Sequence, residues 1–130
     1  MAAELSEAMI RVLLADDDEG FLASLCELID HQPELLVVGT ATDGLAAIEL
    51  VDDLGPDAAV LDLHMPLLDG VTTVARLRRD HPHLCLIALT GDDAPALRSA
   101  ARESGADDVL LKTEFVDALV ERLTTARATA

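Results

Sequence analysis

The stretch Ala58-Ala59-Val60-Leu61-Asp62-Leu63-His64-Met65-Pro66 decides the fold class of this chain. Four apolar residues in a row, followed at once by a carboxylate, are typical of a short strand buried on both faces of a parallel sheet. Residues 58–61 are therefore predicted to form an inner strand, with Asp62 at its carboxyl end. Because open α/β sheets bind ligands outside the carboxyl ends of their strands, Asp62 is a candidate functional residue.

The same pattern of an apolar run with a polar end occurs three more times along the chain. Asp16 and Asp17 follow Ile10–Ala15, Thr90 follows Leu84–Leu89, and Lys112 follows Val109–Leu111. A further apolar run, Leu35–Ala41, is predicted to be an edge strand. If all five strands are parallel, three carboxylates, a hydroxyl and an ammonium meet at one rim of the sheet.

Segments of helical period alternate with these strands and predict a (βα)5 fold of the α/β class. Asp43 is the expected cap of the second helix, Asp92 or Asp93 of the fourth, and Thr113 of the last. Val116, Leu119, Val120 and Leu123 of the last helix are expected to face the core. The five predicted helices are Glu19–His31, one from Asp43 to about Leu54, one through Val71, Val74 and Leu77 that ends at His81-Pro82, one with Pro95 in its first turn that ends at Gly105, and the last one after Thr113.

Length predicts a single domain, since 130 residues suffice for one hydrophobic core. We expect a flexible N-terminal arm over residues 1–9, the domain over 10–124, and a tail or truncated linker over 125–130. No apolar stretch approaches the roughly 20 residues that a membrane span needs. The first nine residues carry Glu4 and Glu7 and lack the basic, apolar pattern of a signal peptide.

Charge and cysteine content narrow the partners and the compartment. The formal net charge of -16 repels nucleic acid phosphates and anionic membranes, so we expect neither as a partner of this chain alone. Cys26 and Cys85 lie in apolar stretches without a CxxC spacing, which favours reduced thiols over a disulfide. Reduced thiols predict a cytoplasmic location.

The carboxylates at the strand ends predict a metal site. An excess of acids at a helix start would account for Asp18 and Glu19 through the helix dipole. It does not account for Asp16 and Asp17, because carboxylates crowded at a strand end repel one another. Mg²⁺ suits the site, since it binds through one or two carboxylates and keeps ligand positions for water and phosphate oxygens.

The ordered set of these motifs resembles the response regulator receiver domain of bacterial two-component signalling over about residues 10–123. The residues that carry the resemblance are Leu14-Ala15-Asp16-Asp17, Asp62-Leu63-His64-Met65-Pro66 with Asp69-Gly70, Leu89-Thr90, Gly105-Ala106, and Lys112. The resemblance implies a flavodoxin-like three-layer sandwich with strand order 2-1-3-4-5. It also implies a phosphoacceptor that catalyses only its own phosphorylation and dephosphorylation and is not otherwise an enzyme.

Carried over residue by residue, the resemblance makes Asp62 the phosphoacceptor. Asp16, Asp17, Asp62 and the main-chain carbonyl of His64 would bind Mg²⁺. Thr90 and Lys112 would contact the phosphoryl group, and this fits a reaction that depends on positioning and on charge neutralisation. His64 and Asp92 would lie beside the phosphoryl group and tune its hydrolysis, although an exposed loop histidine is an equally good account of His64.

Two departures from the family pattern affect signalling. The family usually has Tyr or Phe three residues before the lysine, as a rotamer switch paired with the threonine, and this chain has Val109 there. A weaker or differently transmitted switch is therefore expected from Thr90. Thr113 stands where many receivers have a proline with a cis bond. A residue other than proline at this position resembles the subfamily with a C-terminal helix-turn-helix.

The resemblance implies a sensor histidine kinase as phosphodonor and leaves a homodimer open. Transcription regulation is expected through an output domain that these 130 residues do not contain, and a stand-alone receiver is the alternative. A degenerate receiver is disfavoured because the five key residues are complete. A phosphatase of the haloacid dehalogenase type is disfavoured because His64 stands where that family has a second Asp.

Overall fold

A parallel five-stranded sheet forms the centre of the structure, a computed structural model that describes residues 9–125. The strand order is β2-β1-β3-β4-β5, which confirms the expected topology. The strands are β1 (Ile10–Ala15), β2 (Leu35–Ala41), β3 (Ala58–Asp62), β4 (Cys85–Thr90) and β5 (Asp108–Leu111). All four strand pairs are parallel, so the carboxyl ends of the strands lie at one edge.

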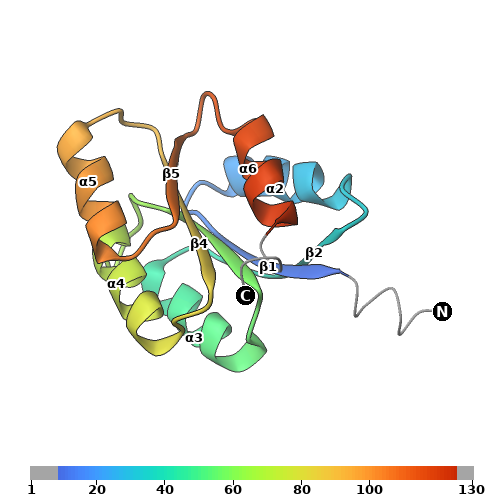
Figure 1. The fold of residues 1–130 in the computed structure, drawn as a ribbon, viewed down its shortest axis with the longest axis horizontal. Coiled ribbons are helices and arrows are strands. Elements are labelled where there is room, and N and C mark those ends of the chain that lie inside the picture. Colours follow the sequence, from blue (N-terminus) through green and yellow to red (C-terminus); the bar gives the residue numbers. More distant parts are fainter. Residues whose placement is uncertain (1–8, 126–130) are drawn as a thin grey trace.

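Five helices cover the two faces of the sheet and complete the expected three-layer sandwich. They are α2 (Glu19–Asp30), α3 (Gly44–Leu54), α4 (Gly70–Asp80), α5 (Pro95–Ser104) and α6 (Val116–Thr124). Helices α3, α4 and α5 lie on one face, and α2 and α6 lie on the other (Figure 1).

Side chains of each inner strand alternate between two apolar cores. In β1, Leu13 packs in the core beneath α3–α5, whereas Val12 and Leu14 pack in the core beneath α2 and α6. All three side chains are fully buried. This explains why the inner strands are continuously apolar rather than alternating, because a helix layer removes both of their faces from water.

Carboxylate caps begin three of the helices as their sequences suggest. Asp18, Asp43 and Asp69 accept hydrogen bonds from the backbone N–H groups three residues on, at 3.1, 2.8 and 2.9 Å. Gly70 at the start of α4 packs so closely on the backbone of Leu63 that a Cβ would overlap it. The Asp69-Gly70 pair therefore lets α4 begin directly beside the end of β3.

The predicted cap of α5 is wrong. Ala94 occupies the N-cap position and makes no side-chain hydrogen bond, and Pro95 is the first helical residue. Proline has no N–H at a position where that group would lack a partner anyway, so less is left for a capping side chain to satisfy. The Asp93 carboxylate pairs instead with Arg98, at 2.8 Å.

The predicted start of the last helix is also wrong. Helix α6 begins at Val116 with Phe115 at its N-cap, and no side chain caps it. Phe115 is buried, whereas Val116 is exposed and does not face the core; Leu119 and Leu123 do. Burial of the Phe115 ring fixes where the chain turns into the helix, and this packing outweighs the capping preference of Thr113.

Residues 1–8 of the expected arm and 126–130 of the expected tail lie outside the described residues. Among residues 9–125, no helix is both long enough and apolar enough to cross a bilayer. Within the same range every peptide bond is trans, including Lys112–Thr113.

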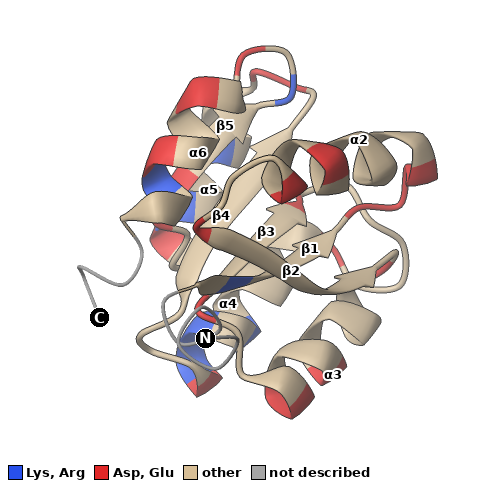
Figure 2. Ribbon diagram, turned by 90° about the vertical axis from the view of Figure 1, so that its right-hand side faces the viewer, with Lys and Arg blue, Asp and Glu red and all other residues tan. Residues whose placement is uncertain are grey.

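Acidic and basic side chains are unevenly distributed over the fold. Figure 2 shows acidic residues around most of the molecule and few basic ones. From Val12 to Ala75, the chain contains no Lys or Arg at all. Helices α2 and α3 therefore carry only negative charge, and α4, α5 and α6 carry most of the positive charge.

Candidate metal centre and phosphoryl site

Three aspartates come together at the carboxyl edge of the sheet. Ala15 at the end of β1 lies beside Leu61 in β3. Asp16 and Asp17, directly after β1, therefore meet Asp62 at the end of β3. Each offers a carboxylate oxygen, and these oxygens lie within 4.8 Å of one another. Asp16 and Asp62 are buried and Asp17 is exposed. Parallel pairing of two apolar strands thus concentrates negative charge where water is scarce.

Asp16 is held rigidly by its surroundings. Its N–H donates to the carbonyl of Ala41 in β2 at 3.0 Å, and its Oδ1 accepts the N–H of Asp18 at 2.9 Å. Its Oδ2 belongs to a carboxylate that is only 1% exposed and faces the Lys112 ammonium at 2.7 Å. The two oxygens of Asp16 are thus held in place, one by the main chain and the other by a positive charge.

Lys112 supplies positive charge between the buried carboxylates. Its Nζ lies 2.7 Å from Asp16 Oδ2 and 3.4 Å from Asp62 Oδ2. The backbone N–H of Lys112 donates to the carbonyl of Thr90 at 2.9 Å, so the end of β4 fixes the position of the Lys112 backbone. Desolvation opposes the charge on Lys112, but the two carboxylates outweigh it and raise the lysine pKa above its usual value.

Asp62 is a buried carboxylate with an unusually weak acidity. Burial raises its pKa to about 6, and the charge of Asp16 adds to this effect. The His64 N–H, which donates to Asp62 Oδ1 at 3.1 Å, opposes the shift, as does Lys112. In the absence of a cation, ionising Asp62 therefore costs free energy, which a bound divalent cation would return.

The donor set fits Mg²⁺. The ligands on offer are carboxylate oxygens of three aspartates that lie close together. Hard oxygen ligands, few in number and open to water on the Asp17 side, suit a cation that keeps part of its hydration shell. The residues present therefore satisfy the chemistry of the cation that the sequence suggests.

Thr90 lies at the same edge, but its hydroxyl is occupied elsewhere. Thr90 is fully buried at the end of β4, beside Leu111 in β5. Its Oγ1 donates to the carbonyl of Asp92 at 3.1 Å and accepts the Asp92 N–H at 3.0 Å. The hydroxyl thus closes a local turn and contacts neither Asp62 nor Lys112 through a hydrogen bond.

Comparison with known proteins identifies the family. The model of the response regulator receiver domain matches residues 12–124. The chain belongs to this family. It is a receiver domain of two-component response regulators.

Relatives of this receiver domain have different overall functions. A protein-glutamate methylesterase/protein-glutamine glutaminase of Methanosarcina acetivorans is 36% identical over 104 residues, which are 79% of this chain and 29% of the relative. The transcriptional regulatory protein DegU of Brevibacillus brevis is 30% identical over 121 residues, 93% of this chain and 51% of DegU. This receiver domain thus spans between about a third and a half of these curated relatives.

Solved structures match the fold over nearly its whole length. The receiver domain of the response regulator NarL from Mycobacterium tuberculosis is 32% identical with a TM-score of 0.82, and the match covers 92% of this chain and 97% of that one. The response regulator domain of Thermotoga maritima CheB is 30% identical with a TM-score of 0.84 and the same coverage.

The remaining predicted residues of the receiver domain differ in burial. His64 and Asp92 are exposed on the two loops that flank Asp62, and Val109 is fully buried in β5. The structure brings Asp16, Asp17, Asp62 and Lys112 together directly, whereas Thr90 and Asp92 bond to each other.

Two further residues that lie at or near the site of this receiver domain were not among those predicted from the sequence. The Lys112 ammonium lies 4.4 Å from the centre of the Phe21 ring. Arg98 bridges the Asp93 carboxylate and the carbonyl of Val109, at 2.8 and 3.1 Å. The one available signal for Phe21 was that aromatic residues are only 2% of the chain.

Proposed function

We propose that this chain accepts a phosphoryl group on Asp62 from a sensor histidine kinase and thereby switches a partner-binding surface. The observation that supports this proposal is the packing of Asp16, Asp17 and Asp62 within 4.8 Å, with the Lys112 ammonium between two of them. A fold needs no such arrangement of buried charge for its stability, because crowded carboxylates repel. An arrangement of three carboxylates and an ammonium is suited to binding a cation and an anion side by side.

In the proposed reaction an oxygen of Asp62 attacks phosphorus, and the bond from phosphorus to the donor's leaving atom breaks. The product is an acyl phosphate. The Lys112 ammonium, already 3.4 Å from Asp62 Oδ2, moves with the new phosphoryl oxygens. The Thr90 hydroxyl leaves the Asp92 carbonyl and donates to one of them. Asp62 is mostly ionised at neutral pH, since its pKa is about 6.

Mg²⁺ would be held by Asp16, Asp17, Asp62 and the main-chain carbonyl of His64. When bound, it would neutralise charge on the phosphoryl oxygens. His64 and Asp92 are proposed to tune the lifetime of the phosphoryl group, because both side chains are exposed next to it and can order or exclude water.

Intact-mass spectrometry with acetyl phosphate and Mg²⁺ tests the proposal. The native chain should gain the mass of one phosphoryl group, and Asp62→Asn should gain none. Asp53→Asn, a change of the same kind on the exposed surface of α3, is the matched control and should behave as the native chain. Phosphorylation of Asp62→Asn, or none of the native chain, would contradict the assignment.

The surface formed by α5, β5 and α6 is the proposed output surface. Thr90 bonds to Asp92, the neighbouring Asp93 pairs with Arg98, and Arg98 bonds to the carbonyl of Val109. Movement of the Thr90 hydroxyl toward a phosphoryl group would loosen the first of these bonds. The change could then reach α5 and β5 through Arg98 without the aromatic side chain that the family usually has.

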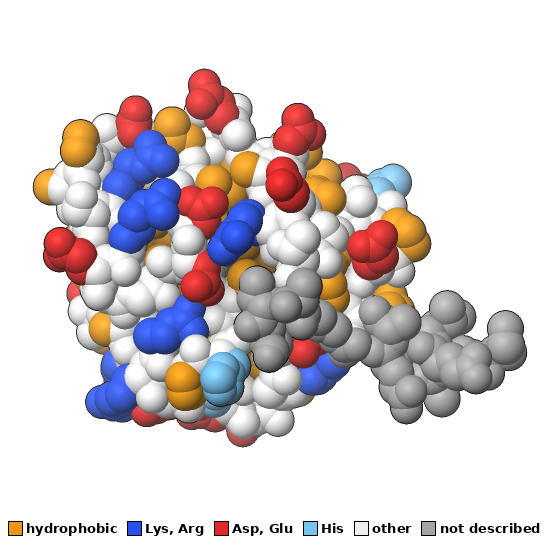
Figure 3. Space-filling view, viewed as in Figure 1, with side chains coloured by type: hydrophobic (Ala, Val, Ile, Leu, Met, Phe, Trp, Pro, Cys, Tyr) orange, Lys and Arg blue, Asp and Glu red, His pale blue; other side chains and the backbone are white. Residues whose placement is uncertain are grey.

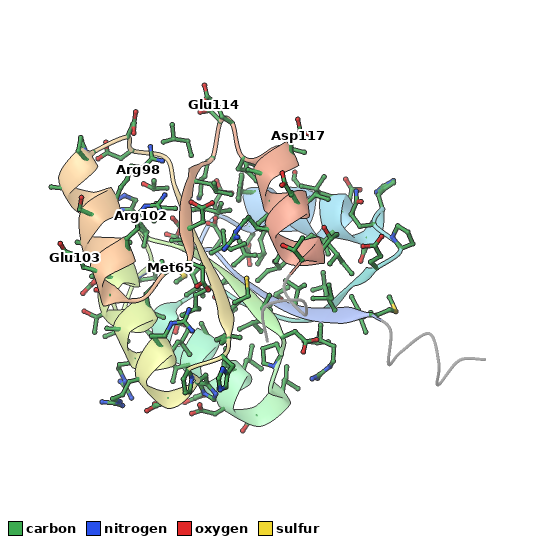
Figure 4. All side chains as sticks on the ribbon, in the orientation of Figure 1. Met65, Arg98, Arg102, Glu103, Glu114 and Asp117 are labelled. Carbon is green, nitrogen blue, oxygen red and sulfur yellow. The ribbon has the colours of Figure 1, made fainter. Side chains whose placement is uncertain are left out.

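Charges on this surface suit a polar partner. Arg98, Arg102 and Glu103 project from α5, while Glu114 and Asp117 stand beyond β5 and at the start of α6 (Figure 4). In the space-filling view of the same face, basic side chains lie next to acidic ones over α5 (Figure 3). A second copy of the receiver domain is proposed as one such partner.

Hydrogen exchange with and without Mg²⁺ and beryllofluoride, a phosphoryl mimic, tests this surface. Amides of residues 91–97 and 109–115 should change protection in the native chain. Arg98→Leu should confine the changes to the loops around Asp16 and Asp62. Native changes confined to those two loops would overturn the proposed output surface and leave the phosphoacceptor role intact.

The proposed output is transcription regulation, through a domain outside these residues. Similarity to DegU and to the NarL receiver supports it. Similarity to the methylesterases supports a second candidate, control of a protein methylesterase domain. Sequencing the gene's flanking codons, or testing the full-length product for DNA binding and for methylesterase activity, separates the two.

A further inference from the structure

The contact between Lys112 and Phe21 is an unusual feature of this site. The Phe21 ring lies at the start of α2, where its centre is 4.4 Å from the lysine Nζ. The Lys112 side chain is only 20% exposed, and its ammonium also contacts Asp16 and Asp62. A cation this close to a ring face is attracted by the quadrupole of the ring, more strongly when water is excluded.

We infer that Phe21 is a positioning residue for Lys112. The Phe21 ring holds the ammonium toward Asp62 while the carboxylates that contact the ammonium change their partners. The two carboxylates that hold Lys112 are the same groups that would turn to a bound cation and to a phosphoryl group. Asp16 Oδ2, at 2.7 Å, is the nearer of the two carboxylate partners, and Asp62 Oδ2 lies at 3.4 Å. A ring has no lone pair to offer to a metal, so Phe21 keeps its contact with the ammonium.

The second phenylalanine of the chain supports the first. The Phe115 ring centre lies 5.6 Å from that of Phe21, with the planes inclined at 53°. Tilted pairs at this distance are favourable because the positive edge of one ring meets the negative face of the other. Phe115 is buried under α6, so it fixes the position of Phe21 from the side of the core.

This arrangement also gives phosphorylation a second outlet. A shift of Lys112 toward a phosphoryl group would alter its contact with Phe21 and, through Phe115, the packing between α2 and α6. These helices lie on the face of the sheet opposite α5 (Figure 1). The chain lacks an aromatic residue at Val109; of its two phenylalanines, Phe21 contacts Lys112 and Phe115 contacts Phe21.

The aromatic content of the chain makes a direct test simple. With no Tyr or Trp and two Phe, a protein labelled with ¹³C in phenylalanine shows two ring spin systems, assigned by Phe115→Leu. The ring signals of Phe21 should shift in Lys112→Met without any ligand. They should shift again in the native protein on addition of Mg²⁺ and beryllofluoride. An unchanged Phe21 signal in both experiments overturns the inference.

Kinetics with acetyl phosphate at saturating Mg²⁺ tests the positioning role. Phe21→Leu should lower the phosphorylation rate constant roughly three- to tenfold, the factor expected from loss of a cation–π contact. Mg²⁺ affinity should stay unchanged, and Phe21→Tyr should restore the rate because it keeps the ring. Phe115→Leu, which removes a ring that supports Phe21 but does not touch Lys112, should lower the rate less than Phe21→Leu does.

These outcomes separate this inference from the proposed function on which it rests. A native protein that takes no phosphoryl group on Asp62 refutes the proposed function. A native protein that is phosphorylated at the same rate as Phe21→Leu refutes only the positioning role. Equal losses in Phe21→Leu and Phe115→Leu would also refute it, since they would show a general packing effect.

Discussion

The two edges of the same sheet satisfy their charges in opposite ways. At the amino edge, the Arg78 guanidinium donates to the carbonyls of Gly105, Pro82 and Leu84 and to the Asp107 carboxylate, all at 2.8–2.9 Å. The same oxygen of Asp107 accepts the N–H of Leu86 at 2.8 Å. Each donor group of this arginine thus has a partner, and the pattern joins α4, β4 and the loop before β5.

The carboxyl edge leaves its charges incompletely satisfied. Asp16 and Asp62 share one ammonium, and burial raises the pKa of Asp62 to about 6. The comparison indicates that the polar groups of the amino edge stabilise the fold, whereas those of the carboxyl edge are, in the function proposed above, kept for a ligand. Substitutions at the two edges should therefore have separable effects.

The largest expected effect is that of Lys112→Met on phosphorylation. Removing the ammonium from a buried phosphoryl site should lower the rate constant with acetyl phosphate about a hundredfold, the usual scale for losing one preorganised charge or donor. Mg²⁺ binding should not weaken, since the ammonium repels the cation. Intact-mass time courses and Mg²⁺ titration measure the two quantities. A variant that is phosphorylated normally but no longer binds Mg²⁺ would contradict this role.

Arg78→Leu should destabilise the fold by about 2–4 kcal/mol, because four acceptors at the amino edge, two of them in partly buried hydrogen bonds, lose their donor. Urea unfolding measures the change. The neighbouring Arg79, which is exposed and pairs with the exposed Asp80, is the matched control, and Arg79→Leu should have little effect. The increase in stability caused by Mg²⁺ should persist in Arg78→Leu. Its disappearance would show that the two edges are not independent.

Mg²⁺ should stabilise the native chain by about 2.7 kcal/mol at a concentration of roughly 100 times its Kd. Asp17→Ala should lose most of this gain, because it removes one of the three clustered carboxylates. Thermal unfolding in millimolar Mg²⁺, compared with unfolding in EDTA, measures the shift in melting temperature. An unchanged melting temperature of the native chain would count against the metal site.

Asp62→Asn should stabilise the metal-free protein at pH 7.5 by about 1–2 kcal/mol, since it removes a charge that burial disfavours. The pKa of Asp62 is raised from 3.8 to about 6 in the folded state, so the native state binds the proton more tightly than the unfolded chain does. The contribution of Asp62 to the free energy of unfolding should therefore rise as pH falls from 7 toward 4. The advantage of Asp62→Asn should disappear over the same range, and urea unfolding in EDTA between pH 7.5 and 5 tests this.

Much of the fold and the outline of the site could be predicted from the sequence. Runs such as Ala58–Leu61 reveal buried strands because their apolar character is local, and Asp62, Asp16 and Lys112 follow at strand ends for the same reason. The caps of α5 and α6 could not be predicted in this way. Pro95 and the buried Phe115 override the propensities of nearby Asp and Thr residues, and their effect depends on what surrounds them.

The sequence by itself determined the order of strands and helices, the charge, and which polar residues stand at strand ends. Only the tertiary structure decided that Lys112 lies between Asp16 and Asp62, that Thr90 bonds to Asp92, and that Phe21 lies against the ammonium. The physical reason is the range of the interactions. An apolar run shows its burial within a few residues, whereas a contact between residues distant in the chain exists only after parallel strands and two helix layers have packed.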